Sequence, residues 1–239
     1  MDALWLHIVQ WLHTVGLHVD AGTAREVAGG MAQVTQKLDM PSLLALAAAL
    51  GWASGFRLYA VVFIVGLMGA TGLLALPAGL HMLENPLVLA VAGCLMLVEF
   101  FADKVPWIDS AWDAVHTVIR VPGGALLAAG VFGADNATMG VIAGLLGGSL
   151  AATSMATKMT TRAAVNTSPE PFSNWGLSFF EDGLVVAVVW LATQHPVAFG
   201  IALVAMVVVS VLLLVVLFQF LRAVLRRVSR FFSGSPGVA

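Results

Sequence analysis

Charged residues are scarce in this sequence, and their scarcity excludes an ordinary soluble globular protein. Lys, Arg, Asp and Glu make up only 10% of the 239 residues, whereas soluble domains carry about 25%. Hydrophobic residues account for 60% of the chain. A chain of this composition cannot cover a globular surface with charge, so it is predicted to be an integral membrane protein. No nucleic-acid partner is expected.

Cysteine and the common catalytic motifs are also missing. Cys94 is the single cysteine, which excludes an intrachain disulfide framework and a cysteine-based metal site. The sequence has no glycine-rich nucleotide loop, no HExxH motif and no serine nucleophile with its base. We therefore expect no enzyme and no cofactor, although an intramembrane acid–base enzyme remains an alternative. No cleavable signal peptide is predicted either.

The chain divides by hydropathy into four parts. Residues 1–20 place Trp5, Ile8 and Leu12 at helical spacing, so an amphipathic helix on the membrane surface is predicted there. A polar connector over 21–41, a transmembrane helical domain over 42–221 and a basic cytoplasmic tail over 222–239 follow.

The transmembrane domain is predicted to be all-α, with about six spanning helices and a broken first helix. The apolar run over 42–76 is too long for one span of about 20 residues, and "GWASG" (51–55) interrupts it with small residues. We predict a half-helix over 42–53 and a full span over 56–76. Further spans are predicted at 86–102, 117–134, 137–157, 176–194 and 197–220. The third of these is interrupted by Arg120 and Pro122.

The basic residues predict the orientation. The turns at 77–85, around 135 and at 194–197 contain no Lys or Arg. The positive-inside rule places these turns outside, with both termini in the cytoplasm. The basic tail, "RAVLRRVSR" (222–230), would then face anionic lipid.

Charged residues recur at helical spacing beside the apolar runs. Glu99 and Asp103 are four apart, as are Lys158 and Arg162, so each pair lies on one helical face. Asp109, Asp113, His116 and Arg120 follow with intervals of four, three and four. Ionisable residues within a membrane indicate a functional site, and the alternative is that they only pair or reach the interface to fix topology.

Together these charges predict a ring around a water-filled vestibule near the cytoplasmic interface. The candidate residues for binding an ion or a small charged metabolite are Arg57, Glu99, Asp103, Lys104, Asp109, Asp113, Arg120, Lys158, Arg162, Asn166, Glu181 and Asp182. A divalent metal on Asp109, Asp113 and His116 is one reading of part of this set. Pairing of Asp113 and His116 with Arg120 is the favoured reading.

Glu181 and Asp182 are predicted to open the fifth span. A helix N-terminus stabilises a carboxylate by only about 0.3–1 kcal/mol, which is less than the cost of burying an unpaired one. We therefore predict that at least one of them contacts Lys158, Arg162, Arg57 or Arg120, and that the other faces the vestibule.

Several of these segments resemble one bacterial membrane family. "GFRLY", "VEFFADKVPWID", "RVPGGALLA", "TKMTTRAAVNTSPEPFSNWGLSFFEDG" and the closing basic helix are similar to the integral membrane proteins grouped as domain of unknown function 4126. The resemblance covers about 42–228 and includes the twelve candidate positions. It implies the membrane fold and the charged site, and it brings no activity. The histidine that members often carry before the lysine is replaced here by "TSMATK".

Three functions stay open at this stage. A small transporter or channel is the leading hypothesis, and an inverted repeat of three spans per half would fit it. The first alternative is a protein that binds lipid headgroups or flips lipids, with Arg120, Lys158 and Arg162 holding a phosphate. The second is a non-transporting subunit or scaffold, which leaves a homo-oligomer or a membrane-complex partner open.

Overall fold

The computed structural model describes residues 39–133, 136–166 and 172–232, and every regular element in these ranges is helical. The predicted surface helix over 1–20 and most of the connector lie outside the described residues. The elements in chain order are α3 (Met40–Ala70), the short 3-10 helix η1 (Ala78–Glu84), α4 (Pro86–Ala102), α5 (Pro106–Gly130), α6 (Ala137–Val165), α7 (Phe172–Gln194) and α8 (Pro196–Phe232).

Four helices are long and apolar enough to cross a membrane: α3, α6, α7 and the part of α8 up to Arg227. A fifth span results if η1 and α4, which are bent by 69° at their junction, are taken together. The chain is therefore an all-helical protein of the multi-pass membrane type. The sequence predicts about six spans. Helix α5, which carries Asp109, Asp113 and Arg120, is not among the helices apolar enough to cross, and α4 qualifies only together with η1.

The first helix is broken, as the sequence predicts, but the break lies at Arg57. That residue has φ −147° and ψ 78°, outside the helical region, within the otherwise helical α3. The glycine cluster at 51–55 ends two residues earlier. We call residues 40–56 the first limb and residues 58–70 the second limb. The helix ends at Ala70, so the predicted full span over 56–76 is wrong in extent, because only the second limb follows the break.

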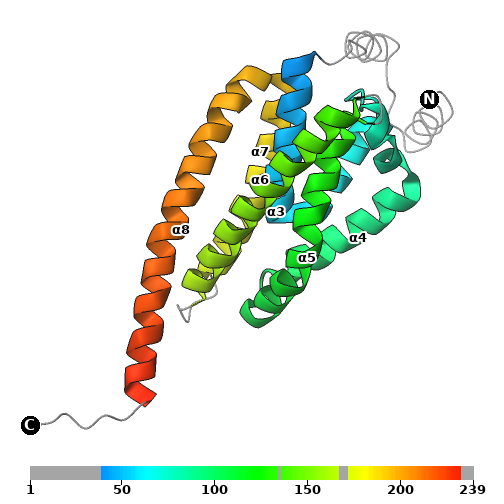
Figure 1. Ribbon diagram of the computed structural model, residues 1–239. Helices are drawn as coiled ribbons and strands as arrows, with labels where there is room; N and C mark the ends of the chain where they lie inside the picture. The colour runs from blue at the N-terminus through cyan, green and yellow to red at the C-terminus, as the bar shows by residue number, and fades with distance from the viewer. Residues whose placement is uncertain (1–38, 134–135, 167–171, 233–239) are drawn as a thin grey trace, which may run out of the picture.

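Both ends of α3 lie at the same end of the bundle (Figure 1). The first limb runs alongside α6, because Gly51 approaches Gly147 closely and Gly55 approaches Ser154. The second limb returns toward η1, since Gly66 packs against the carbonyl of Leu83. A cytoplasmic connector and an external 77–85 turn would lie at opposite ends of the bundle. In the structure (Figure 1) the start of α3, which follows the connector, lies at the same end as η1.

The turn predicted over 77–85 is a packed element. Gly79 lies against the carbonyl of Gly130 and near Gly133, which has a φ of +59°. Leu80 and Leu83 are buried. This end of the bundle thus holds η1, the end of α5 and the start of α6 together.

Three other helix boundaries differ from the sequence prediction. Helix α5 begins at Pro106 and continues through Pro122, so the predicted start at 117 and the interruption there are wrong. Helix α7 begins at Phe172, which places Glu181 and Asp182 more than two turns inside it instead of at its N-terminus. Helix α8 continues to Phe232, so the basic tail predicted from 222 begins as part of the same helix.

Local capping explains where several helices begin. Asp39 accepts a hydrogen bond from the backbone N–H of Ser42 at 3.0 Å, and hydrogen bonds from the Ser42 side chain and backbone lower the pKa of Asp39. Asn85 accepts from the N–H of Leu87 at 2.9 Å before Pro86, and Asn136 begins α6 in the same way. Asn and Asp are preferred caps because their side chains satisfy the first free N–H groups of a helix. The predicted span at 86–102 matches α4.

The closest helix contact depends on glycine. A Cβ on Gly51 would lie 2.5 Å from the Cα of Gly147, and one on Gly55 would overlap Ser154 and the carbonyl of Ala151. Small residues let helix backbones approach closely in membranes. The Ser154 hydroxyl donates to the carbonyl of Trp52 across this contact at 2.7 Å. The contact holds the first limb, which leads to Arg57, against α6.

This contact generates a stability prediction. We expect Gly55→Ala to lower the free energy of unfolding by roughly 1–3 kcal/mol, because the added methyl group overpacks the interface with α6. Gly183→Ala is the matched control, since a Cβ at Gly183 meets nothing within 4 Å. Thermal unfolding of both variants in detergent measures the difference. Equal midpoints for the two variants would contradict the proposed packing.

Candidate functional site

Charged side chains from five elements meet at the break in α3. The buried members are Arg57, Glu99, Asp103, Asp109, Asp113, Arg120, Lys158, Arg162 and Glu181. We call this set the charge cluster. All nine belong to the predicted ring, so the sequence prediction that these residues gather is confirmed. The cluster is buried instead of lining an open vestibule, and only the neighbouring Asp182 is partly exposed, at 33%.

Arg57 joins the break to α4 and α7. Its Nη2 lies 2.7 Å from Asp103 and donates to the Ser178 hydroxyl at 3.0 Å. Its Nε lies 2.9 Å from Asp182, and Glu181 is 3.7 Å away. A planar guanidinium can contact several carboxylates at once. The non-helical backbone at Arg57 is therefore accompanied by contacts from two other elements.

Arg120 makes the second group of ion pairs, between α5 and α4. Its Nη1 lies 2.6 Å from Asp113 on the same helix, and its Nη2 bonds to Glu99. Asp113 thus pairs with Arg120, as the favoured reading predicts. His116 does not pair with Arg120. Its Nδ1 lies 2.8 Å from the carbonyl of Trp112, and its ring stacks on the Trp112 ring.

Arg162 and Glu181 form a two-point ion pair between α6 and α7. The Nε and Nη2 of Arg162 donate to the two oxygens of Glu181 at 3.2 and 2.6 Å. Arg162 also donates to the carbonyl of Asp103 at 3.0 Å. The prediction that at least one of the two acids near 181 contacts a base is confirmed for both. Asp182, through its partial exposure, is the one that faces outward.

Lys158 lies between the arginines and forms ion pairs with four carboxylates. Its Nζ is 3.3 Å from Asp113 and 3.6–3.9 Å from Asp103, Glu181 and Glu99. Its one recorded hydrogen bond among the described residues runs to the carbonyl of Phe56, at 3.3 Å. That carbonyl is at the break in α3, where the helical pattern stops. Lys158 therefore shares its positive charge among four carboxylates, none of them closer than 3.3 Å.

Acids outnumber bases in the cluster, five to four. Asp109 is fully buried, and neither of its oxygens accepts a hydrogen bond from a residue that the structure describes. Its nearest positive charge is Arg162, at 3.8 Å. Carboxylate oxygens of Asp103, Asp109 and Asp113 all lie within 4.8 Å of one another. Three carboxylates this close favour a positive ligand between them.

Two further predicted site residues, Lys104 and Asn166, follow the ends of α4 and α6. The Nζ of Lys104 bonds to the carbonyl of Phe100 and lies 3.0 Å from the centre of its ring. Asn166 ends α6, and its N–H bonds to the carbonyl of Arg162. Sequence reasoning missed Ser178 and the carbonyl of Phe56. Ser178 lies three residues before Glu181, and this helical spacing could have indicated it.

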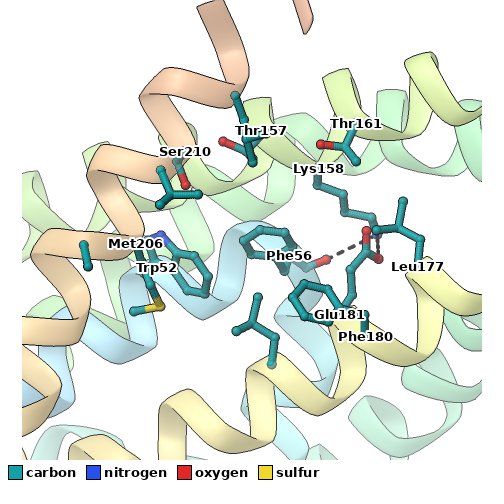
Figure 2. Close-up of a pocket in the computed structure, with 14 residues that line it drawn as sticks. Trp52, Phe56, Thr157, Lys158, Thr161, Leu177, Phe180, Glu181, Met206 and Ser210 are labelled. Atoms are coloured by element: carbon teal, nitrogen blue, oxygen red, sulfur yellow. Dashed lines mark hydrogen bonds and ion pairs between the residues drawn. The ribbon is translucent and has the colours of Figure 1, made fainter. Parts of the chain in front are cut away.

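A cavity of about 330 Å³ lies beside the cluster, between α3, α6, α7 and α8. Figure 2 shows Trp52 and Phe56 on one wall, with Lys158 and Glu181 at the side nearest the charges. We call it the side cavity. Its lining residues are Trp52, Phe56, Thr157, Lys158, Thr161, Leu177, Phe180, Glu181, Leu184, Ala205, Met206, Val209, Ser210 and Leu213.

Residues 44–216 match the family described as Domain of unknown function (DUF4126), and the chain belongs to that family. This match confirms the resemblance that the sequence motifs indicate. No curated protein and no solved structure matches the chain. The family description states no activity, so the site itself has to indicate the function.

Substitution of the two adjacent acids of α7 is expected to lower the free energy of unfolding by different amounts. Glu181→Gln should cost about 3–5 kcal/mol, because it leaves buried Arg162 without its closest carboxylate. Asp182→Asn should cost about 1 kcal/mol or less, since its ion pair is partly exposed. Size-exclusion profiles and thermal midpoints of the purified variants measure the contrast. A larger loss in Asp182→Asn than in Glu181→Gln would contradict these contacts.

Proposed function

We propose that this member of the DUF4126 family is a multi-pass membrane transporter that binds a cation in the charge cluster. The observation that carries the proposal is Asp109, a fully buried carboxylate without a hydrogen-bond donor among the described residues. A buried ionised carboxylate is costly unless it is paired. A proton or a metal cation between Asp109, Asp103 and Asp113 would remove that cost.

The charge balance supports a positive ligand. The five buried acids exceed the four buried bases, so a single positive charge neutralises the cluster. The arginines already use their closest contacts on carboxylates, which leaves little room for an anionic metabolite. Oxygen ligands suit hard cations such as Mg²⁺, Ca²⁺ or Mn²⁺. A proton is the smallest ligand that meets the same requirement.

The broken helix supports transport. Non-helical backbone within a membrane is tolerated only where protein or a water-filled cavity surrounds it. Broken helices at the middle of the bundle commonly form the binding sites of transporters. Arg57 lies at such a break and contacts acids from two other elements. Binding of a cation to these acids would change the partners of Arg57, which connects the site to the shape of α3.

The exposed arginines indicate which end of the bundle faces the cytoplasm. Arg222, Arg226 and Arg227 lie near the end of α8 that is distant from η1. The turns at the η1 end contain no Lys or Arg. By the positive-inside rule, the arginine end of α8 faces the cytoplasm of a bacterial inner membrane, where it would contact anionic lipid. Met40 then lies at the outer end, and the side of the N-terminus depends on residues 1–38.

The prediction of six spans remains a proposal, and it requires that α5 and the η1–α4 pair cross the membrane. The inverted repeat also stays a prediction. So do the homo-oligomer or complex partner, and the expectation that the chain is not an enzyme and has no cofactor.

The proposal is tested by binding and flux together. Purified protein is titrated with Mg²⁺, Ca²⁺, Mn²⁺ and Na⁺, and separately across pH 5 to 8, while thermal unfolding is followed. A cation at a hundred times its dissociation constant should add about 2.7 kcal/mol of stability. Asp109→Asn should lose this response, because the amide cannot supply the negative charge.

Asp39→Asn is the matched control, because Asp39 is exposed at the start of α3 and Asn also caps helices. Proteoliposomes loaded with a pH-sensitive dye or a metal-sensitive dye then report flux under an imposed gradient. Identical responses from the wild type and Asp109→Asn in both assays would overturn the proposal.

A further inference from the structure

We propose that the side cavity binds one acyl chain of an anionic membrane phospholipid, which enters sideways from the bilayer. This inference goes beyond cation binding and does not depend on it. The cavity is bounded by four helices and lies beside the charge cluster. Its volume of about 330 Å³ is at the lower end of the range for ligand pockets, roughly 300–1,000 Å³.

The mouth of the cavity faces the outer surface of the bundle. Phe180, Val209 and Leu213 line the cavity and are also exposed. Neighbouring residues of α8, including Val208, Leu212 and Val216, are exposed and apolar as well. In a membrane-spanning helix this surface contacts hydrocarbon. What enters through such a mouth comes from the bilayer interior and is apolar.

The shape of the cavity suits a chain that lies along the helices. Its lining runs on α8 from Ala205 to Leu213, which at 1.5 Å per residue is about 12 Å. Trp52 and Phe56 form the inner wall, and Met206 lies across from them (Figure 2). Apolar side chains line most of this length. A flexible hydrocarbon chain that packs against such a wall makes the same favourable dispersion contacts as a core side chain.

The polar wall on α6 indicates the headgroup. Lys158 and Glu181 are the charged residues among those that line the cavity. Glu181 is neutralised by its two bonds to Arg162, whereas Lys158 shares its charge among four carboxylates, the nearest at 3.3 Å, and donates one hydrogen bond to the carbonyl of Phe56. The hydroxyl groups of Thr157 and Thr161 share this wall. The available donors therefore favour a phosphate over an ammonium group.

This wall lies near the end of the helices, at the depth where lipid headgroups are found. Thr161 lies about one turn before Val165, where α6 ends. A phosphate near Thr161 is thus close to the end of the helices, where headgroups lie, while the chain extends toward Ala205. Exposed Arg222, Arg226 and Arg227 continue beyond the cavity along α8 and attract anionic lipid to this end of the protein.

The test uses full-length protein in nanodiscs that contain a phosphatidylglycerol probe with a photoreactive diazirine near the end of one acyl chain. After irradiation, mass spectrometry identifies the labelled residues. We expect label on the inner wall, at the peptide that contains Trp52 and Phe56. Val209→Trp should reduce this label about tenfold, equivalent to a loss of about 1.4 kcal/mol in binding, because the indole fills the mouth.

Val208→Trp is the matched control, since Val208 is as exposed as Val209 (52% against 53%) and does not line the cavity. Ala205→Trp is a second blocking variant at the other end of the cavity, should Val209→Trp not fold. Thr161→Val tests the headgroup without a change in size. It should reduce the preference for the phosphatidylglycerol probe over a phosphatidylcholine probe that carries the same diazirine chain.

The outcomes separate this site from the cation site. Asp109→Asn should keep the inner-wall label, so loss of cation binding leaves this inference intact. Label confined to the outer face of α8, or equal inner-wall label in Val208→Trp and Val209→Trp, overturns it. Equal labelling by the phosphatidylglycerol and phosphatidylcholine probes overturns the assignment of an anionic headgroup.

Discussion

The structure depends on the mutual neutralisation of charges inside an apolar bundle. Each of the three buried arginines contacts at least two carboxylates, and the contacts run between α3, α4, α5, α6 and α7. A buried charge that loses its partner costs several kcal/mol. Displacement of any one of these helices would therefore leave a buried charge unpaired. The network therefore fixes which helices are neighbours, while the apolar contacts determine how closely they approach.

The cation site and the side cavity share a wall. Lys158 and Glu181 belong to the charge cluster and line the cavity. A cation near Asp113 would weaken the attraction of that carboxylate for Lys158, which lies 3.3 Å away. Lys158 would then be freer to bond to a phosphate in the cavity. Two ligands that act on the same lysine are coupled, and linkage requires that each alters the affinity for the other by the same factor.

The sequence was sufficient to predict which charged residues gather, but it predicted the boundaries of their helices less well. Helical spacing identified the buried faces at Asp109–Asp113 and Lys158–Arg162, because a charge beside apolar runs needs a partner. The break was expected at the glycines, but it lies at Arg57, where contacts with α4 and α7 accompany it. Helix α7 begins four residues before the predicted span at 176–194. Such tertiary effects are invisible to local patterns.

The hairpin course of α3 has a consequence for biosynthesis. Arg57 is made before all of its partners, since Asp103, Glu181 and Asp182 come later in the chain. Its burial is then a late, post-insertion step. The nascent chain acquires its final fold only when the ribosome has delivered the carboxylates of α7.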